Sequence, residues 1–189
     1  MTTLFINTCV RKNSRTMRLA EHYLSRIEDE IITVHPVEEG LCGLDGDMLA
    51  IRDEALMNKD YDHPVLKYAG QFAKADTIVI AAPYWDLSFP AALKQYFELI
   101  NAMGITFAYT SDGFPKPLCK ANVLYYVTTA GGAFCPEEYG YGYVKALAEN
   151  FYGIADVKLI KAVGFDVDGA DESKILQEAI GRLAKDAGL

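Results

Sequence analysis

The feature that most limits the fold is an alternation, along the whole chain, of short β-rich apolar segments with longer segments of helical periodicity. The candidate strands are residues 3–8, 30–36, 76–83, 121–130 and 156–165. The candidate helices are residues 14–28, 64–73, 90–101, 138–152 and 171–187. Parallel strands need such crossover helices, which cover both faces of their sheet. The pattern predicts an α/β fold of three layers, in which helices flank a five-stranded parallel sheet of order 2-1-3-4-5.

Two segments stand outside this alternation. Residues 41–63 carry many charges and two glycines, so we expect a surface excursion with a short helix at 47–57. Residues 104–120 are interpreted as a β-like excursion with a turn. A chain of 189 residues with 51% hydrophobic content can bury one core, which predicts a single domain over residues 1–189. Pro90 is expected at the first position of its helix, with Ser88 near enough to cap it.

Composition excludes several classes of function. The formal charge of −8 and the lack of basic runs argue against a nucleic-acid partner. No apolar stretch reaches the roughly 18 residues that would span a membrane, and the first residues do not follow the order of a signal peptide, so we expect a cytoplasmic protein. The four cysteines stand far apart without Cys/His pairing, which predicts free thiols and no metal centre. The three histidines likewise meet no candidate nucleophile.

Three loops follow predicted strands and are therefore expected at one edge of the sheet. They are residues 8–16, 82–90 and 128–143. In open parallel sheets, ligands bind beyond the carboxyl ends of the strands, where the strand order reverses. One ligand could thus contact all three loops.

The first loop, TCVRKNSRT, favours a phosphate. It supplies hydroxyl and amide groups together with Arg11 and Arg15, and it leads directly into a helix. The backbone N–H groups and partial positive charge of a helix start attract anions. Asn13 or Ser14 can equally be a plain helix cap, and at this stage both interpretations stand. Neither the Walker A pattern nor the dinucleotide fingerprint is present, which disfavours ATP and conventionally bound NAD.

The second and third loops favour a flat ring. Large apolar side chains occupy the strand end at Pro83, Tyr84, Trp85 and Leu87, where polar turn residues are usual. A dimer contact would also explain them. The pair Gly131 and Gly132 allows close approach of the backbone to a ligand, although a plain turn would use the same residues. A phosphate site, an aromatic wall and a glycine-lined edge together describe a site for flavin mononucleotide (FMN).

The chain resembles the flavodoxin-like NAD(P)H:quinone reductases and FMN-dependent azoreductases over nearly its whole length. The residues that carry the resemblance are NSRTMRLA (13–20), LDGDMLAIRDE (44–54), ADTIVIAAPYWDLSFPAALKQYFE (75–98), GFPKPL (113–118) and VTTAGG (127–132). Each is weak alone, and their order and spacing make them specific for the family. The resemblance implies a flavodoxin-like fold and FMN as the cofactor.

The resemblance also implies which residues bind the cofactor. Ser14 and Thr16 would hold the FMN phosphate with Arg11 nearby, and Cys9 stands where relatives usually carry serine. The second loop would run beside the isoalloxazine ring, and the third would line its pyrimidine side. These two loops contribute Pro83, Tyr84, Trp85, Asp86, Leu87, Thr128, Thr129, Gly131 and Gly132. Asp86 departs from the usual Asn or aromatic residue, and a carboxylate beside the flavin would lower its midpoint potential.

The implied activity is oxidation of NADH or NADPH with transfer of two electrons to a quinone, azo compound or nitroaromatic compound. Hydride transfer would follow a ping-pong pattern, and flavin N5 would carry the hydride without a catalytic side chain. Tyr139 and Tyr141 are candidate substrate-contacting residues, with helix-face core as the competing interpretation. The family resemblance implies a homodimer. The alternatives are an electron-carrying flavodoxin and a flavodoxin-like interaction module without cofactor.

Overall fold

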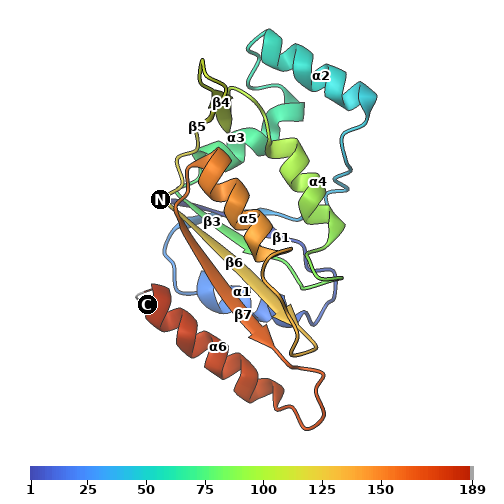
Figure 1. Ribbon diagram of the computed structural model, residues 1–189, viewed down its shortest axis with the longest axis vertical. Helices are drawn as coiled ribbons and strands as arrows, with labels where there is room; N and C mark the ends of the chain where they lie inside the picture. Colours follow the sequence, from blue (N-terminus) through green and yellow to red (C-terminus); the bar gives the residue numbers. More distant parts are fainter. Residues whose placement is uncertain (188–189) are drawn as a thin grey trace.

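The computed structural model describes residues 1–187 of the chain, with side chains described through residue 182. Its centre is a parallel sheet of order β2-β1-β3-β6-β7 (Figure 1). The strands are β1 (Thr2–Asn7), β2 (Glu30–Val34), β3 (Thr77–Ala81), β6 (Val123–Ala130) and β7 (Asp156–Val163). All four strand pairs are parallel. Counting only these five strands, the observed order is the predicted 2-1-3-4-5.

Helices cover both faces of the sheet and complete the three predicted layers (Figure 1). One face carries α1 (Arg15–Leu24) and α6 (Glu172–Ala187). The other carries α3 (Lys67–Lys74), α4 (Ala91–Ile100), α5 (Tyr141–Leu147) and the π-helical turn η2 (Ala148–Tyr152). Alternate residues of β1 supply the two cores, since Phe5 packs on the first face while Leu4 and Ile6 pack on the second.

The excursions also follow the sequence pattern. A helix, α2 (Gly46–Met57), begins after Asp45, whose side chain accepts a hydrogen bond from the amide of Met48. It projects from the body of the protein at the end opposite α6 (Figure 1). A short 3₁₀ turn, η1 (Pro64–Leu66), leads into α3. Strands β4 (Phe107–Tyr109) and β5 (Pro115–Pro117) pair antiparallel as a small separate sheet.

Some predicted helix boundaries were wrong. Pro90 is the N-cap of α4 instead of its first helical residue, and its φ of −56° and ψ of 143° are extended. Ser88 does not cap this helix, because its hydroxyl donates to the carbonyl of Tyr139 at 2.8 Å. The predicted 138–152 helix begins only at Tyr141 and ends in the π-helical turn. Within the described residues, no helix combines the length and apolar character that a membrane span requires. All four cysteines are free thiols, as predicted.

Candidate functional site

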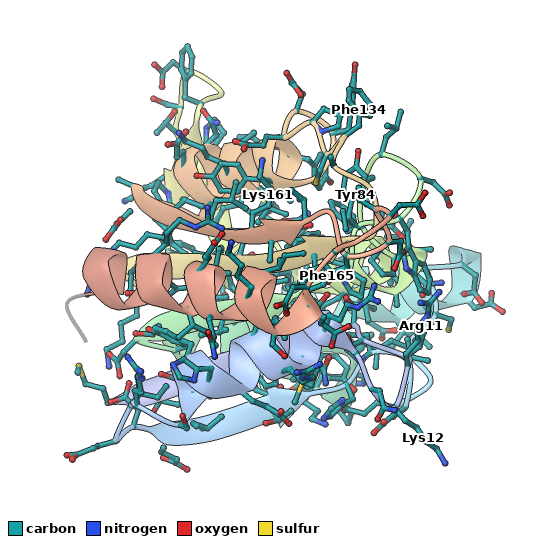
Figure 2. The ribbon with its side chains drawn as sticks, turned by 90° about the horizontal axis from the view of Figure 1, so that it is seen from below. Arg11, Lys12, Tyr84, Phe134, Lys161 and Phe165 are labelled. Carbon is teal, nitrogen blue, oxygen red and sulfur yellow. The ribbon has the colours of Figure 1, made fainter. Side chains whose placement is uncertain are left out.

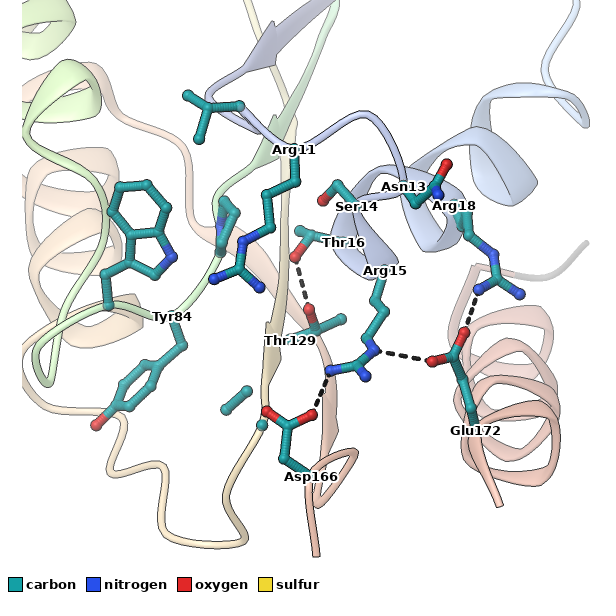
Figure 3. A pocket seen from close by; sticks show the side chains of 15 residues that line it. Arg11, Asn13, Ser14, Arg15, Thr16, Arg18, Tyr84, Thr129, Asp166 and Glu172 are labelled. Carbon is teal, nitrogen blue, oxygen red and sulfur yellow. Dashed lines mark hydrogen bonds and ion pairs between the residues drawn. The ribbon is translucent and has the colours of Figure 1, made fainter. Parts of the chain in front are cut away.

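A cavity of about 800 Å³ opens at the carboxyl edge of the sheet (Figure 3). This volume lies in the usual range for small-molecule sites. Its lining comes from the loops after β1 and β3, the end of β6, and the loop and helix after β7. The lining residues are Val10, Arg11, Asn13, Ser14, Arg15, Thr16, Arg18, Pro83, Tyr84, Trp85, Thr129, Ala130, Gly131, Asp166 and Glu172. The three loops that the sequence indicated therefore converge, and a fourth joins them.

The start of α1 forms one end of the cavity. Ser14 is the N-cap, and its hydroxyl accepts a hydrogen bond from the amide of Met17 at 3.2 Å. Its role as a cap is thus confirmed. Among the described residues, the amides of Arg15 and Thr16 have no hydrogen-bond acceptor. Free amides and the partial positive charge of the helix start make this end suitable for an anion.

Arg11 adds a positive charge to the same end. Its side chain extends into the cavity from the loop after β1 (Figure 3), and it forms no ion pair with the described residues. Figure 2 shows Arg11 at the same end of the sheet as Tyr84, whereas Lys12 points away into solvent. Of these two neighbouring cations, Arg11 alone is directed at the cavity.

A buried hydroxyl pair joins the first loop to the third. The Oγ1 atoms of Thr16 and Thr129 lie 2.7 Å apart, and both side chains are buried. The Thr16 hydroxyl is therefore engaged within the protein, so its free backbone amide is the group that remains to contact a ligand. The carbonyl of Thr129 also accepts a hydrogen bond from the amide of Tyr84 at 3.1 Å. The end of β6 thus fixes both neighbouring loops.

Cys9 lies beside the cavity without lining it. Its amide donates to the side chain of Asn7 at 2.9 Å, and its thiol lies 3.9 Å from the carbonyl of Ala81. Burial raises the pKa of the Cys9 thiol to about 11. The thiol is therefore protonated at neutral pH and supports the loop instead of acting as a nucleophile.

The loop after β3 is a tight hairpin turn. Trp85 and Ser88 exchange backbone hydrogen bonds of 3.1 and 2.7 Å, and the two residues between them, Asp86 and Leu87, have φ values of 50° and 68°. Positive φ at both central positions defines a type I′ turn. Pro83, Tyr84 and Trp85 line the cavity, whereas Asp86 and Leu87 are exposed at the hairpin tip and do not.

Adjacent residues of β6 face different spaces, because side chains alternate along a strand. Thr129 lines the cavity, whereas Thr128 lines a separate small space together with Tyr84 and Tyr141. The hydroxyl of Tyr141 donates to the carbonyl of Val157 at 2.8 Å. Tyr139 is exposed, with 61% of its surface accessible. The predicted site residues that do not line the cavity are therefore Cys9, Asp86, Leu87, Thr128, Gly132, Tyr139 and Tyr141.

Gly131 lines the cavity for a reason that the sequence did not suggest. A Cβ atom on Gly131 would lie 1.9 Å from Oδ2 of Asp166, so the Asp166 carboxylate occupies the space of the missing side chain. The amide of Asp166 donates to the carbonyl of Gly131 at 2.8 Å. Around Gly132, by contrast, the nearest atom to such a Cβ is 4.0 Å away. A larger residue at 131 would therefore have to displace the Asp166 carboxylate.

Sequence reasoning missed the charged side of the cavity. Arg15 donates to Asp166 at 2.8 Å and to Glu172 at 2.9 Å, and Glu172 also pairs with Arg18 (Figure 3). The guanidinium of Arg15 lies over the ring of Phe165, 4.8 Å from its centroid. These carboxylates raise the pKa of Arg15, and the two arginines lower the pKa of Glu172. The one available signal was that DVDGADE (166–172) also follows a predicted strand.

Comparison with known proteins agrees with this arrangement. The family described as having a flavodoxin-like fold matches residues 1–187. A Coprothermobacter proteolyticus protein named FMN-dependent NADH:quinone oxidoreductase is 37% identical over 182 residues, covering 89% of this chain and 88% of that protein. A protein of the same name from Clostridium beijerinckii is 36% identical over 181 residues, covering 92% and 90%.

Solved structures share the fold at lower identity. An azoreductase from Bacillus anthracis str. Sterne superposes with a TM-score of 0.84 at 23% identity, covering 98% of each chain. An FMN-dependent NADH-azoreductase from Bacillus anthracis str. Ames Ancestor, in complex with FMN, gives a TM-score of 0.79 at 23% identity, covering 100% of this chain and 98% of the other. With the whole described chain matched and relatives above one-third identity, this protein belongs to the family of flavodoxin-like fold proteins.

Proposed function

We propose that this chain is an FMN-dependent NADH:quinone oxidoreductase that also accepts azo compounds. The observation that carries the proposal is the convergence of three strand-end loops on one cavity, which has an anion-attracting end at α1 and an aromatic wall at Tyr84 and Trp85. The names of the relatives above support the same activity. Each of those relatives matches this chain over most of both lengths.

The residues of the cavity fit FMN in their chemistry. A phosphate needs N–H donors and positive charge, which the free amides of Arg15 and Thr16 and the guanidinium of Arg11 supply. A flat aromatic ring needs apolar surface, which Tyr84 and Trp85 supply. A volume of about 800 Å³ is large enough for both parts of the cofactor.

We therefore assign two groups of FMN-binding residues. At the phosphate end, Arg11, Ser14 and Thr16 would hold the anion, Ser14 and Thr16 mainly through the helix start that they shape. Along the ring we assign Pro83, Tyr84, Trp85, Thr129 and Gly131. Cys9, Thr128 and Gly132 are assigned supporting positions, since each neighbours a lining residue in the chain. Asp86 and Leu87 form the turn that follows Trp85, and we assign them no contact with the flavin ring.

When bound, FMN accepts a hydride from the nicotinamide and passes two electrons to the acceptor. The protein's share is to hold the cofactor, to leave one face of its ring open to both substrates in turn, and to limit water at that face. The rings of Tyr84 and Trp85 provide the apolar surface for this purpose. No side chain of the cavity is required as a nucleophile, and the raised pKa of Cys9 agrees with that view.

The names of these relatives favour NADH over NADPH as the donor, and turnover with each nucleotide measures the preference. Tyr139 remains our candidate for an acceptor contact because it is exposed near the second loop, where its carbonyl accepts from Ser88. Tyr141 is a weaker candidate, since its hydroxyl is already donated to Val157.

We also propose that the chain acts as a single domain, assembles as a homodimer and works in the cytoplasm, where NADH is available. Exposed apolar side chains on and near α2 support the dimer, because a partner subunit could bury this apolar surface. They are Leu49, Ile51, Met57 and Tyr61. Light scattering coupled to size exclusion would measure the assembly, and a monomer at all concentrations would contradict it.

The visible spectrum of the purified protein tests the main proposal. We expect a yellow protein whose flavin absorbance bleaches on anaerobic addition of NADH and returns on addition of menadione. Steady-state turnover should give parallel double-reciprocal plots. A yellow protein that NADH does not bleach would indicate an electron-carrying flavodoxin, and a colourless protein that takes up no FMN would indicate an interaction module.

A further inference from the structure

We propose that Asp166 lowers the reduction potential of the bound flavin, an inference that rests on the proposed function. The sequence placed a carboxylate beside the flavin at Asp86. In the structure Asp86 lies exposed at the tip of the hairpin turn, outside the cavity lining. Asp166, from the loop after β7, lines the cavity instead.

The backbone holds Asp166 firmly at this position. Its amide donates to the carbonyl of Gly131 at 2.8 Å, and the amide of Gly164 donates to the carbonyls of Ala130 and Gly132 at 3.2 and 3.1 Å. The loop after β7 is therefore attached to the end of β6 by three hydrogen bonds. Because β6 belongs to the central sheet, this attachment leaves the loop little freedom to move away from the cavity.

The side chain of Asp166 lies against Gly131. The distance from its Oδ2 atom to the position that a Cβ of residue 131 would occupy is 1.9 Å. The family resemblance implies that the segment of Gly131 lines the pyrimidine side of the flavin. This is the part of the ring system on which reduction places negative charge, so the carboxylate and the new charge would be neighbours.

Arginines lie around the carboxylate, and across the cavity lining Arg11, Arg15 and Arg18 outnumber Asp166 and Glu172. Oδ1 of Asp166 accepts from Arg15, but Arg15 also donates to Glu172, so one cation serves two carboxylates on this side (Figure 3). Glu172 is partly compensated in turn by Arg18. With 66% of its side chain accessible, Asp166 is screened by solvent, so the effect on the flavin should be moderate and should shrink at high salt.

A negative charge in the cavity wall disfavours reduced FMN relative to oxidised FMN, which lowers the potential. Asp166→Asn removes the charge and keeps the size and an oxygen that can accept from Arg15. We expect it to raise the affinity for reduced relative to oxidised FMN by about tenfold. For a two-electron couple this is an upward shift of about 30 mV.

Two variants control for simple loss of charge. Asp168→Asn makes the same change two residues away, in a side chain that does not line the cavity, and Asp86→Asn makes it at the exposed hairpin tip. Both should leave the potential unchanged. Arg15→Gln removes the cation that offsets Asp166, so it should move the potential downward, opposite to Asp166→Asn.

The measurement is an anaerobic redox titration of the FMN-loaded protein at low and high ionic strength, with excess FMN for variants that bind it weakly. An unchanged potential in Asp166→Asn, or equal shifts in Asp166→Asn and Asp168→Asn, would overturn the inference. The proposed function fails differently, since a wild-type protein that binds no FMN or is not reduced by NADH refutes it before any variant is compared.

Discussion

The close approach of Asp166 to Gly131 makes a prediction that needs no cofactor. A Cβ at residue 131 would lie 1.9 Å from Oδ2 and 2.8 Å from Cγ of Asp166, both far below normal contact distances. Since Gly131 is not among the residues with positive φ, its backbone conformation itself accepts alanine. The effect of Gly131→Ala is therefore confined to moving the Asp166 side chain aside.

The size of this effect follows from what Asp166 loses. Rotation of its carboxylate breaks the ion pair with Arg15, and at 66% side-chain exposure such a pair contributes at most about 1 kcal/mol. Leaving the preferred rotamer adds about 0.5–1.5 kcal/mol. Gly132→Ala is the matched control, because nothing lies nearer than 4.0 Å to its Cβ position. Both variants gain the same stabilisation from restricting the unfolded chain, so it cancels in their difference.

We therefore expect Gly131→Ala to be less stable than Gly132→Ala by about 1–2 kcal/mol, which corresponds to a Tm lower by about 2–8 °C for a chain of this size. Urea denaturation and differential scanning fluorimetry of the apoprotein measure the difference. Adding Asp166→Ala to each variant should remove it, which gives a coupling energy between residues 131 and 166. Equal stability of the two glycine variants, or a difference that persists without Asp166, would refute the packing on which the argument depends.

Three further predictions test other parts of the site. Arg11→Gln should weaken FMN binding about tenfold, through loss of a charge-assisted hydrogen bond, while riboflavin binding stays unchanged in fluorescence titrations; Lys12→Gln, which alters a cation that points into solvent, should affect neither. Thr16→Val or Thr129→Val alone should lower the free energy of unfolding by about 1–3 kcal/mol, since each leaves the other buried hydroxyl without a hydrogen-bond partner. In urea denaturation, the double variant should lose less stability than the sum of the two single variants. Burial raises the pKa of Cys9 from 9.0 to about 11, so the thiol loses its proton at lower pH in the unfolded chain than in the folded one, and the free energy of unfolding should fall as the pH rises from 9 to 11. Cys9→Ala should reduce this fall by up to about 2 kcal/mol, and identical pH profiles of the two proteins would contradict the burial of the thiol.

The fold was predictable because its strands carry their own signal. DTIVIAA is a run of core residues without helical period, and β3 is buried from Ile78 to Ala81 as the centre of a parallel sheet requires. The edges of elements were less predictable. The sequence gives no indication that α5 ends in a π-helical turn, or that the hydroxyl of Ser88 is donated to Tyr139 instead of capping α4.

The part of the site that is built from local sequence features was predictable, and the part that depends on long-range contacts was not. The α1 start and the residues Pro83, Tyr84 and Trp85 are local features, so their pattern can be recognised directly in the sequence. Asp86 was placed beside the ligand because it neighbours Trp85 in the chain, but the type I′ turn directs it away, and Asp-Leu lacks the Asn-Gly signature of such turns. The pair of Arg15 and Asp166 is separated by 151 residues in sequence. Only tertiary structure brings them together.

The end of β6 is what joins these local features into one site. The Thr129 hydroxyl contacts Thr16 of the first loop, and its carbonyl accepts from Tyr84 of the second. The carbonyl of Gly131 accepts from Asp166 of the fourth. Because these bonds exist within the protein itself, the cavity is formed before any ligand enters. Changes at the end of β6 should therefore lower stability and cofactor affinity together. A change at Arg11, whose side chain bonds to none of the described residues, should lower affinity alone.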